Sequence, residues 1–273
     1  MRIKTFQMDI IPGDPRANRD RVKEWFARHL DASLKDTDLV VLPEMWTTAY
    51  TLPELKDLAE PAEHNESTGL LQTLAKKYGT NIIGGSIAVK KGMDIFNRAL
   101  VIDRKGDLIY TYDKLHLVPM LDEPTYLSPG TSQVEAFELD GMKMGLIICF
   151  DLRFPEVTRR LALQGAKALF IPAEWPAART RHWEVLSQAR AIENQMYVVS
   201  SNRVGSYNNI EFAGRSMIIS PWGDVLAEGS SEREELVESV LDLEHVTKVR
   251  KEVPTLSSRV PEYYSINEGG FAK

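Results

Sequence analysis

The single cysteine of the chain, Cys149, stands where a reactive thiol can form. It closes the apolar run 142–149 (MKMGLIIC), which predicts a buried strand, and the segment FDLRFP after it is typical of a turn that opens a helix. A thiol at such a turn lies near the positive end of the helix dipole, which lowers its pKa, and the backbone N–H of Phe150 can face an oxyanion. A buried structural cysteine, which packs as a small hydrophobe, is the alternative that the residues leave open.

A cysteine nucleophile needs a base, and histidine is its usual partner. His29 falls in the apolar stripe of an expected helix, and His64 and His245 lie in polar contexts, so no task is indicated for these three. Only His116 and His182 stand near other candidate residues. No pair of histidines or cysteines has the spacing of a metal site, so we expect neither a metal nor another cofactor.

Two residues at the ends of expected strands offer a second kind of partner for the thiol. Glu44 follows the apolar segment VVLP, and Lys114 opens the segment KLHL. Taken singly, a carboxylate or a lysine at such a place is most often solvated. Next to a thiol, a carboxylate in apolar surroundings can accept the proton, and an ammonium stabilises both the thiolate and a tetrahedral oxyanion. A base, a cation and a nucleophile are what acyl transfer from an amide requires.

These residues lie among alternating strand-like and helix-like segments. Short apolar or alternating runs predict strands, and apolar residues at helical spacing predict helices. Strands are expected at 2–10, 38–43, 81–89, 95–103, 107–113, 142–149, 167–171, 197–201 and 234–241, with a hairpin of 215–220 and 224–228. Helices are expected at 15–34, 67–78, 154–164 and 180–195. This alternation predicts a layered α/β fold.

Several of the expected strands end in a polar or reactive residue. These residues are Glu44, Cys149, Glu174 and Asn202. Ligands of open α/β sheets bind beyond the carboxyl ends of the strands, so we expect the site at this edge. The irregular, proline-rich segment 114–132 is a long loop of the kind that usually has a function. The tail from residue 244 onward is polar and shows little apolar periodicity.

Composition limits the classes of function. The 273 residues are 43% hydrophobic and 26% charged, which is ordinary for a globular protein, and the net charge of −6 makes nucleic acid a poor candidate partner. One cysteine allows no intrachain disulfide, and a reducing compartment fits. The N-terminal segment lacks the apolar core of a signal peptide, and no apolar run approaches the roughly 20 residues of a membrane helix. We therefore expect a cytoplasmic protein without a membrane partner, built as one domain with a C-terminal extension.

The chain resembles the nitrilase superfamily of carbon–nitrogen hydrolases from the strand at 2–10 to about residue 242. The matching segments are VVLPE at 40–44, YDKLHL at 112–117, GLIICFDLRFPE at 145–156, ARAIEN at 189–194, FAGRS at 212–216 and PWG at 221–223. The resemblance implies a four-layered α-β-β-α sandwich over residues 1–242 and a C-terminal extension over 243–273. It also implies a small-molecule amide as substrate, and a homodimer that packs through helices near the nucleophile and through the C-terminal tail.

The family's catalytic roles carry over to four residues of this sequence by resemblance. Glu44 corresponds to the general base, Lys114 to the lysine that stabilises the oxyanion, and Cys149 to the nucleophile. Glu123 lies in the segment DEPTYLSPG, where the family places a second glutamate, and its implied role is to orient Lys114 and the substrate. The alternative for Glu123 is an exposed loop residue.

The segment AEWPAAR at 173–179, followed by His182-Trp183, is similar to the branch that hydrolyses ω-amides of 2-oxo acids. Members of that branch act on 2-oxoglutaramate and 2-oxosuccinamate. Glu174 stands where some relatives carry asparagine. The expected function is therefore an ω-amidase that works through a cysteine thioester. The alternatives are an N-carbamoyl amine hydrolase, a nitrilase or an acyltransferase on the same residues, or a non-enzymatic binding protein that kept the fold.

A substrate with a carboxylate needs a cation, and arginine binds a carboxylate through two hydrogen bonds. Arg179 is the first candidate for this role, and Arg153 is the second. The alternative for Arg153, which we favour, is a salt bridge with Asp151 or Glu156. Two aromatic residues are expected to wall the pocket, Trp175 and Tyr50.

Overall fold

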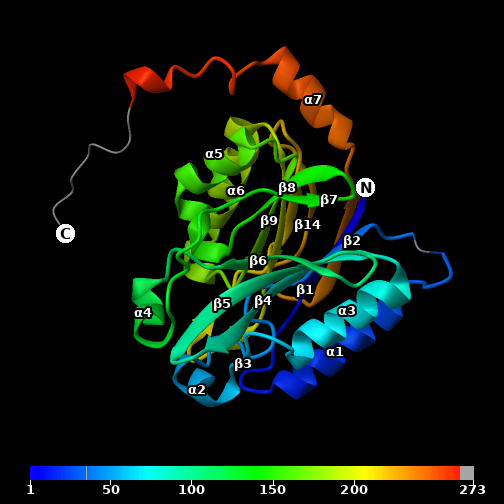
Figure 1. Cartoon of the computed structure of the whole chain (residues 1–273), viewed down its shortest axis with the longest axis vertical. Helices are drawn as coiled ribbons and strands as arrows, with labels where there is room; N and C mark the ends of the chain where they lie inside the picture. The colour runs from blue at the N-terminus through cyan, green and yellow to red at the C-terminus, as the bar shows by residue number, and fades with distance from the viewer. Residues whose placement is uncertain (35, 265–273) are drawn as a thin grey trace.

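The computed structural model describes residues 1–34 and 36–264. Over these residues the chain forms two large β-sheets that lie face to face, with helices on the outer side of each (Figure 1). The core between the sheets joins apolar side chains of both, among them Val41 and Ile83 from one and Phe170 and Val198 from the other. The α-β-β-α sandwich expected from the sequence is confirmed.

The first sheet contains the N-terminal strands. Its members are β1 (Arg2–Gln7), β2 (Leu39–Val41), β3 (Glu60–Pro61), β4 (Asn81–Lys91), β5 (Asp94–Ile102), β6 (Leu108–Asp113) and β15 (Glu235–Val240). The strand order is β15-β1-β2-β4-β5-β6, and the short β3 pairs with β4. Strands β1, β2 and β4 are parallel, so their carboxyl ends meet at one edge.

The second sheet contains the strands of the C-terminal half. Its members are β7 (Phe137–Leu139), β8 (Met142–Leu146), β9 (Ala168–Ala173), β10 (Tyr197–Asn202), β13 (Met217–Ile219) and β14 (Val225–Glu228), in the order β14-β13-β10-β9-β8-β7. Strands β8, β9 and β10 are parallel. All residues of β9 and β10 are buried, as expected for parallel strands covered on both faces. A small separate hairpin joins β11 (Ser206–Tyr207) to β12 (Ile210–Glu211).

Two pairs of helices cover the outer faces. The helices are α1 (Pro15–His29) and α3 (Glu66–Tyr78) on the first sheet, and α5 (Pro155–Leu163) and α6 (Thr180–Asn194) on the second (Figure 1). Side-chain oxygens of Asp14 and Asn65 accept backbone N–H groups at the starts of α1 and α3. Apolar residues such as Phe26 and Leu71 then pack these two helices on their sheet.

The segments around the candidate residues are more irregular than predicted. The strand expected at 142–149 ends at Leu146, and Cys149 begins a 3-10 turn, η3 (Cys149–Arg153). The loop 114–132 contains two short helical turns, η2 (Pro119–Leu121) and α4 (Glu123–Tyr126). Unpredicted turns η1 (Leu52–Glu54) and α2 (Leu55–Leu58) follow the loop that carries Glu44.

Two of the helix predictions also need correction, one near each end of the chain. Helix α1 stops at His29 instead of residue 34, because Leu30 takes an extended conformation. Helix α7 (Leu243–Glu252) forms in the tail for which little periodicity was noted. Its side chains Leu243, Val246 and Val249 are buried at a spacing of three residues, so the helix has a short apolar face that packs on the protein. The proposed boundary at residue 242 stays a prediction, and residues 265–273 of the extension lie outside the described residues.

No helix within 1–34 and 36–264 has the length and hydropathy needed to cross a membrane.

The carboxyl ends of the central strands meet at the edge where the site was expected. The side chain of Glu44, which follows β2, accepts a hydrogen bond from the backbone N–H of Glu174, which follows β9. The next backbone N–H, that of Trp175, donates to Asn202 Oδ1 at the end of β10. Residues from three strands and both sheets therefore converge on one place.

Candidate active site

The nucleophile candidate occupies a strained turn. Cys149 is buried and has a φ angle of 42°, in the left-handed region that costs a non-glycine residue roughly 1–3 kcal/mol. The turn η3 follows directly, and within the described part of the chain the Phe150 N–H donates to no acceptor. The turn therefore presents a thiol and a free backbone donor side by side, as the sequence indicated.

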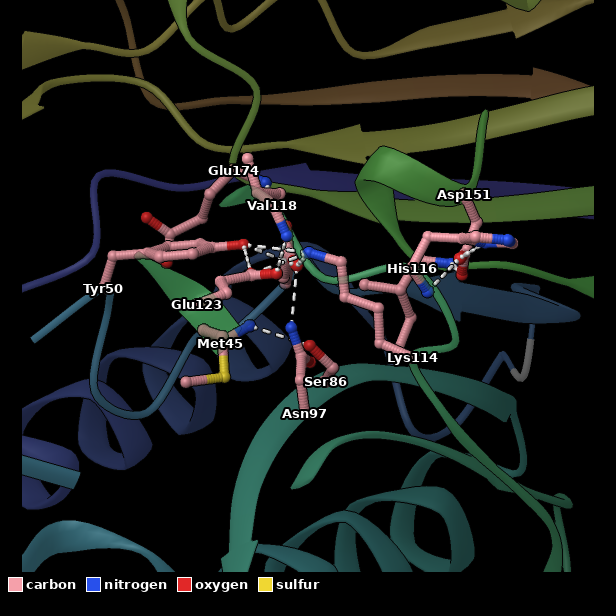
Figure 2. Close-up of polar contacts among 12 residues, drawn as sticks. Met45, Tyr50, Ser86, Asn97, Lys114, His116, Val118, Glu123, Asp151 and Glu174 are labelled. Atoms are coloured by element: carbon pink, nitrogen blue, oxygen red, sulfur yellow. Dashed lines mark hydrogen bonds and ion pairs between the residues drawn. The ribbon is translucent and has the colours of Figure 1, made fainter. Parts of the chain in front are cut away.

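Glu44 is fully buried. It contacts a polar cluster that includes Tyr50, Asn97 and Lys114, whose side chains Figure 2 shows close together. Its Oε1 accepts hydrogen bonds from Lys114 Nζ at 2.9 Å and Asn97 Nδ2 at 2.8 Å, and lies 2.9 Å from the Tyr50 hydroxyl oxygen. Its Oε2 accepts from the backbone N–H of Glu174 at 2.8 Å. Four partners from four separate segments hold this carboxylate in one orientation.

Glu123 is fully buried and holds the other side of Lys114. Its Oε1 lies 2.8 Å from Lys114 Nζ and 2.5 Å from the Tyr50 hydroxyl, and its Oε2 accepts the Val118 N–H at 2.6 Å. The alternative of an exposed loop residue is therefore wrong. The ammonium of Lys114 lies between two carboxylates, which is the geometry of an oriented cation.

Charge compensation keeps this lysine protonated. Burial disfavours the ammonium, but the carboxylates of Glu123 and Glu44 outweigh it and raise the pKa of Lys114. Burial and the charge of Glu44 raise the pKa of Glu123, against the opposing effect of Lys114. Burial and the same two carboxylates hold the pKa of Tyr50 far above its ordinary value, so the tyrosine is a neutral donor.

The thiol of Cys149 is not activated in the way that the sequence suggested. Burial, followed by the charge of Glu44, raises the pKa of Cys149 well above its usual range, and Lys114 opposes this only in part. The expected lowering by a helix dipole is wrong, because η3 is a single short turn and α5 starts six residues after Cys149. The resting thiol keeps its proton and depends on a neighbouring base to remove it.

Asp151, which the sequence analysis did not place in the site, ties the nucleophile turn to the loop that carries the lysine. Its Oδ2 accepts from the Tyr112 hydroxyl at 2.8 Å and the Ile148 N–H at 3.0 Å. Its Oδ1 lies 3.1 Å from the His116 N–H and 2.7 Å from His116 Nδ1. His116 is thus a positioning residue, and its place two residues after the lysine was the available signal.

A small pocket opens over Cys149. Its walls include Phe150, Arg153, Glu174, Trp175 and Arg179, so the fold brings Trp175 and both candidate arginines close to the thiol. The cavity is narrow, about 30 Å³ in volume, and the side chains of Arg153 and Arg179 beside it are half-buried. Tyr50 does not wall this pocket. Its hydroxyl belongs to the carboxylate–lysine cluster.

Arg153 faces the pocket instead of a carboxylate. Its guanidinium stacks 4.5 Å from the Trp175 ring and 5.5 Å from the Phe150 ring, and Nη1 lies 3.2 Å from His182 Nδ1. The favoured salt bridge with Asp151 or Glu156 is wrong, because backbone and ring donors already surround Asp151 and Glu156 is exposed. Burial and the charge of Arg179 lower the pKa of Arg153.

Neither pocket arginine is paired with a carboxylate anywhere in residues 1–34 and 36–264. Two uncompensated guanidinium groups at one pocket favour an anionic ligand.

Glu174 is the remaining charged group of the pocket, and it is fully buried. Its Oε2 accepts from Arg203 Nη1 at 2.7 Å, and Arg203 is itself fully buried. Burial raises the pKa of Glu174 to about 8, with Glu44 adding to the effect and Arg203 opposing it. The sequence analysis named Glu174 and did not identify Arg203, whose role depends on a contact between two separate strand ends.

The carbon-nitrogen hydrolase family model matches residues 2–251. A 2-oxoglutaramate amidase of Bacillus subtilis (strain 168) is 43% identical over 262 residues, covering 96% of this chain and 98% of the relative. An omega-amidase of Danio rerio is 33% identical over 246 residues, covering 87% of this chain and 88% of the relative.

Solved structures agree with this relationship. A carbon-nitrogen hydrolase from Helicobacter pylori G27 superposes with a TM-score of 0.88 at 27% identity, over 97% of this chain and 96% of its own. A Saccharomyces cerevisiae member of branch 10 of the nitrilase superfamily gives 0.85 at 29% identity, over 93% and 94%. The resemblance read from the motifs is confirmed. The chain belongs to the carbon-nitrogen hydrolase family and is a hydrolase that acts on carbon–nitrogen bonds.

Proposed function

We propose that this enzyme hydrolyses the ω-amide of a 2-oxo acid, 2-oxoglutaramate or 2-oxosuccinamate, to the 2-oxo dicarboxylic acid and ammonia. The observation that carries the proposal is the pair of arginines, Arg153 and Arg179, beside the thiol of Cys149. Such a substrate offers a carboxylate to the arginines and a carboxamide to the thiol. The B. subtilis relative is named for an activity on 2-oxoglutaramate, which agrees with this choice.

The mechanism is a two-step acyl transfer. Glu44 removes the proton from Cys149, and the sulfur attacks the amide carbonyl carbon. Lys114 and the Phe150 N–H stabilise the oxyanion. The intermediate collapses as the protonated Glu44 gives its proton to the nitrogen, and ammonia leaves a thioester behind. Glu44 then removes a proton from water, the hydroxide attacks the thioester, and the released sulfur recovers the proton.

Glu123 is the positioning residue for the cation in this scheme. Its carboxylate contacts Lys114 Nζ at 2.8 Å and accepts a hydrogen bond from the Val118 N–H. The loop 114–132 therefore holds the lysine and the glutamate as one unit. The raised pKa of Lys114 agrees with a cation that stays charged throughout the cycle.

Ammonia release by the purified protein tests the proposed substrate. The substrates are 2-oxoglutaramate, glutamine, N-carbamoylputrescine and a simple nitrile. Strong release from the 2-oxo amide alone is expected. Activity on the carbamoyl amine or the nitrile, with none on the 2-oxo amide, contradicts the substrate and leaves the catalytic residues in place.

Loss of either pocket arginine is expected to weaken binding more than chemistry. Arg179→Ala and Arg153→Ala each remove a charge-assisted hydrogen bond, so KM for 2-oxoglutaramate should rise about 10- to 100-fold, with kcat within a few fold. The matched control is an uncharged carboxamide, whose kinetics should change much less. Equal losses on both substrates would show that the arginines hold structure only.

We also propose a homodimer that packs through α5, α6 and the C-terminal segment. A cavity of about 690 Å³ lies between these elements, with Arg159, Leu163, Arg259 and Tyr264 among its walls, and Leu163 and Tyr264 are each 48% exposed. Light scattering on the eluting protein should give twice the chain mass of 30.8 kDa. A mass of one chain contradicts the dimer.

A cytoplasmic location stays a prediction from the sequence.

A further inference from the structure

One carboxylate oxygen beside the nucleophile has no hydrogen-bond donor. Glu174 is fully buried, and its Oε2 is bonded to Arg203. Its Oε1 is buried and, among the described residues, accepts no hydrogen bond. A buried oxygen without a donor costs free energy, which a ligand bringing a donor can recover.

The position of Glu174 is fixed on both sides. Its backbone N–H donates to Glu44 Oε2 at 2.8 Å, and its side chain is held by the buried Arg203. Arg203 also donates to the Ile10 carbonyl at 3.0 Å and lies 4.3 Å from the Phe212 ring, so the pair is anchored in the fold. Glu174 and Cys149 line the same pocket.

The wall of this pocket offers a ligand both donors and an acceptor. Arg153 and Arg179 supply hydrogen-bond donors, which suit a carboxylate. Glu174, which lines the same pocket, supplies a carboxylate oxygen without a donor among the described residues. A primary carboxamide brings two N–H donors to such an acceptor, whereas an ester or a nitrile brings none.

We propose that Glu174 Oε1 accepts a hydrogen bond from an N–H of the bound carboxamide, and that Glu174 thereby selects carboxamides over esters and nitriles. This assignment rests on the proposed amidase function. It makes Glu174 a specificity-determining residue, distinct from Glu44, which moves the proton, and from Glu123, which orients the lysine.

The charges around Glu174 agree with this role. The charged groups that face Glu174 are Arg203 after β10, Glu44 after β2 and Lys114 after β6, and Asp9 lies 3.8 Å beyond on Arg203. Burial leaves the carboxyl with a pKa of about 8. An N–H donor at Oε1 stabilises the ionised form, so binding of a carboxamide lowers this pKa. Below pH 8 the carboxyl is mostly protonated, so binding of a carboxamide must release a proton from Glu174. Carboxamide binding therefore weakens as the pH falls.

The test compares a carboxamide with the ester of the same acid in the wild-type enzyme and in Glu174→Gln. The glutamine has the same shape, but Arg203 takes its single oxygen, and its amide nitrogen then faces the substrate N–H as a second donor. The kcat/KM for 2-oxoglutaramate should fall about 10- to 100-fold, and that for the 5-methyl ester of 2-oxoglutarate by less than about threefold.

The pH profile gives a second readout that a structural role does not move. In the wild-type enzyme, the amide-to-ester ratio of kcat/KM should rise from pH 6 toward pH 8 and then level off, because titrations common to both substrates cancel. In Glu174→Gln the ratio should be independent of pH. Loss of the buried pair with Arg203 should lower the melting temperature, so a single cooperative transition above the assay temperature shows that the variant is folded.

Equal losses on amide and ester, or a ratio that keeps its pH dependence in the variant, would overturn the assignment of Glu174. Failure of the proposed function has a different signature. If the wild-type enzyme does not hydrolyse 2-oxoglutaramate but hydrolyses another carboxamide, the proposed substrate is wrong. The role of Glu174 is then tested by the amide-to-ester ratio of kcat/KM for that carboxamide and its own ester.

Discussion

Cys149→Ala is expected to lose turnover by at least about 10⁴-fold on every carboxamide that the wild-type enzyme hydrolyses. The variant keeps Glu44 and Lys114 in place, so it retains the oriented cation and the base but has no atom to carry the acyl group. Its melting temperature should stay within a few degrees of the wild-type value, because the residue borders a pocket and one buried sulfur is lost.

The measurement is ammonia release combined with mass spectrometry after an acid quench. The wild-type protein should gain the mass of the acyl group during turnover, and Cys149→Ala should not. The matched control is His64→Ala, which changes a residue of the loop before α3 and touches nothing in the site. Wild-type turnover by Cys149→Ala would exclude the thioester mechanism.

Replacement of Lys114 is expected to have the second largest effect. Lys114→Met removes the cation that contacts Glu44 at 2.9 Å and Glu123 at 2.8 Å. Loss of an oxyanion donor alone costs roughly 10²- to 10³-fold in rate. Here the loss should exceed that range, because Lys114 also orients the base Glu44 and balances the charge of the two buried carboxylates.

The same change should lower stability, because breaking a buried ion pair leaves uncompensated charge and costs about 3–5 kcal/mol. The double variant Lys114→Met/Glu123→Gln separates the loss of stability from the loss of turnover, since it removes one carboxylate together with the cation. It should recover much of the melting temperature without recovering turnover. Recovery of turnover in the double variant would show that Lys114 supports the fold and does not act on the oxyanion.

The sequence by itself predicted the central residues of the site. Apolar runs that end in Glu44, Cys149 and Glu174 predict buried strands, and the carboxyl ends of parallel strands share an edge. The order of the motifs added Lys114 and Glu123. The strand ends are local features, because each depends on the residue types within a few positions of the chain. The roles of Lys114 and Glu123 came from the resemblance of the ordered motifs to a known family.

Local pattern was less informative where an element is short. Helix α7 shows its apolar face through only three buried residues, Leu243, Val246 and Val249, within a polar segment. Such a stripe is weak against its background, and packing on the rest of the core stabilises it. The early end of β8 before Cys149 is similar, since an apolar run continues through Ile148 although the pairing stops.

The tertiary structure alone decided how the charges face one another. The partners of Glu44 lie 6 to 130 positions away in the chain, and the pair of Glu174 and Arg203 joins two different strand ends. Arg153 turned toward the aromatic wall of the pocket, and not toward the acids next to it in the sequence. The sign of the Cys149 pKa shift also reversed, since burial and Glu44 outweigh one short turn. Electrostatic effects depend on distance and burial, and both are set by contacts between remote segments.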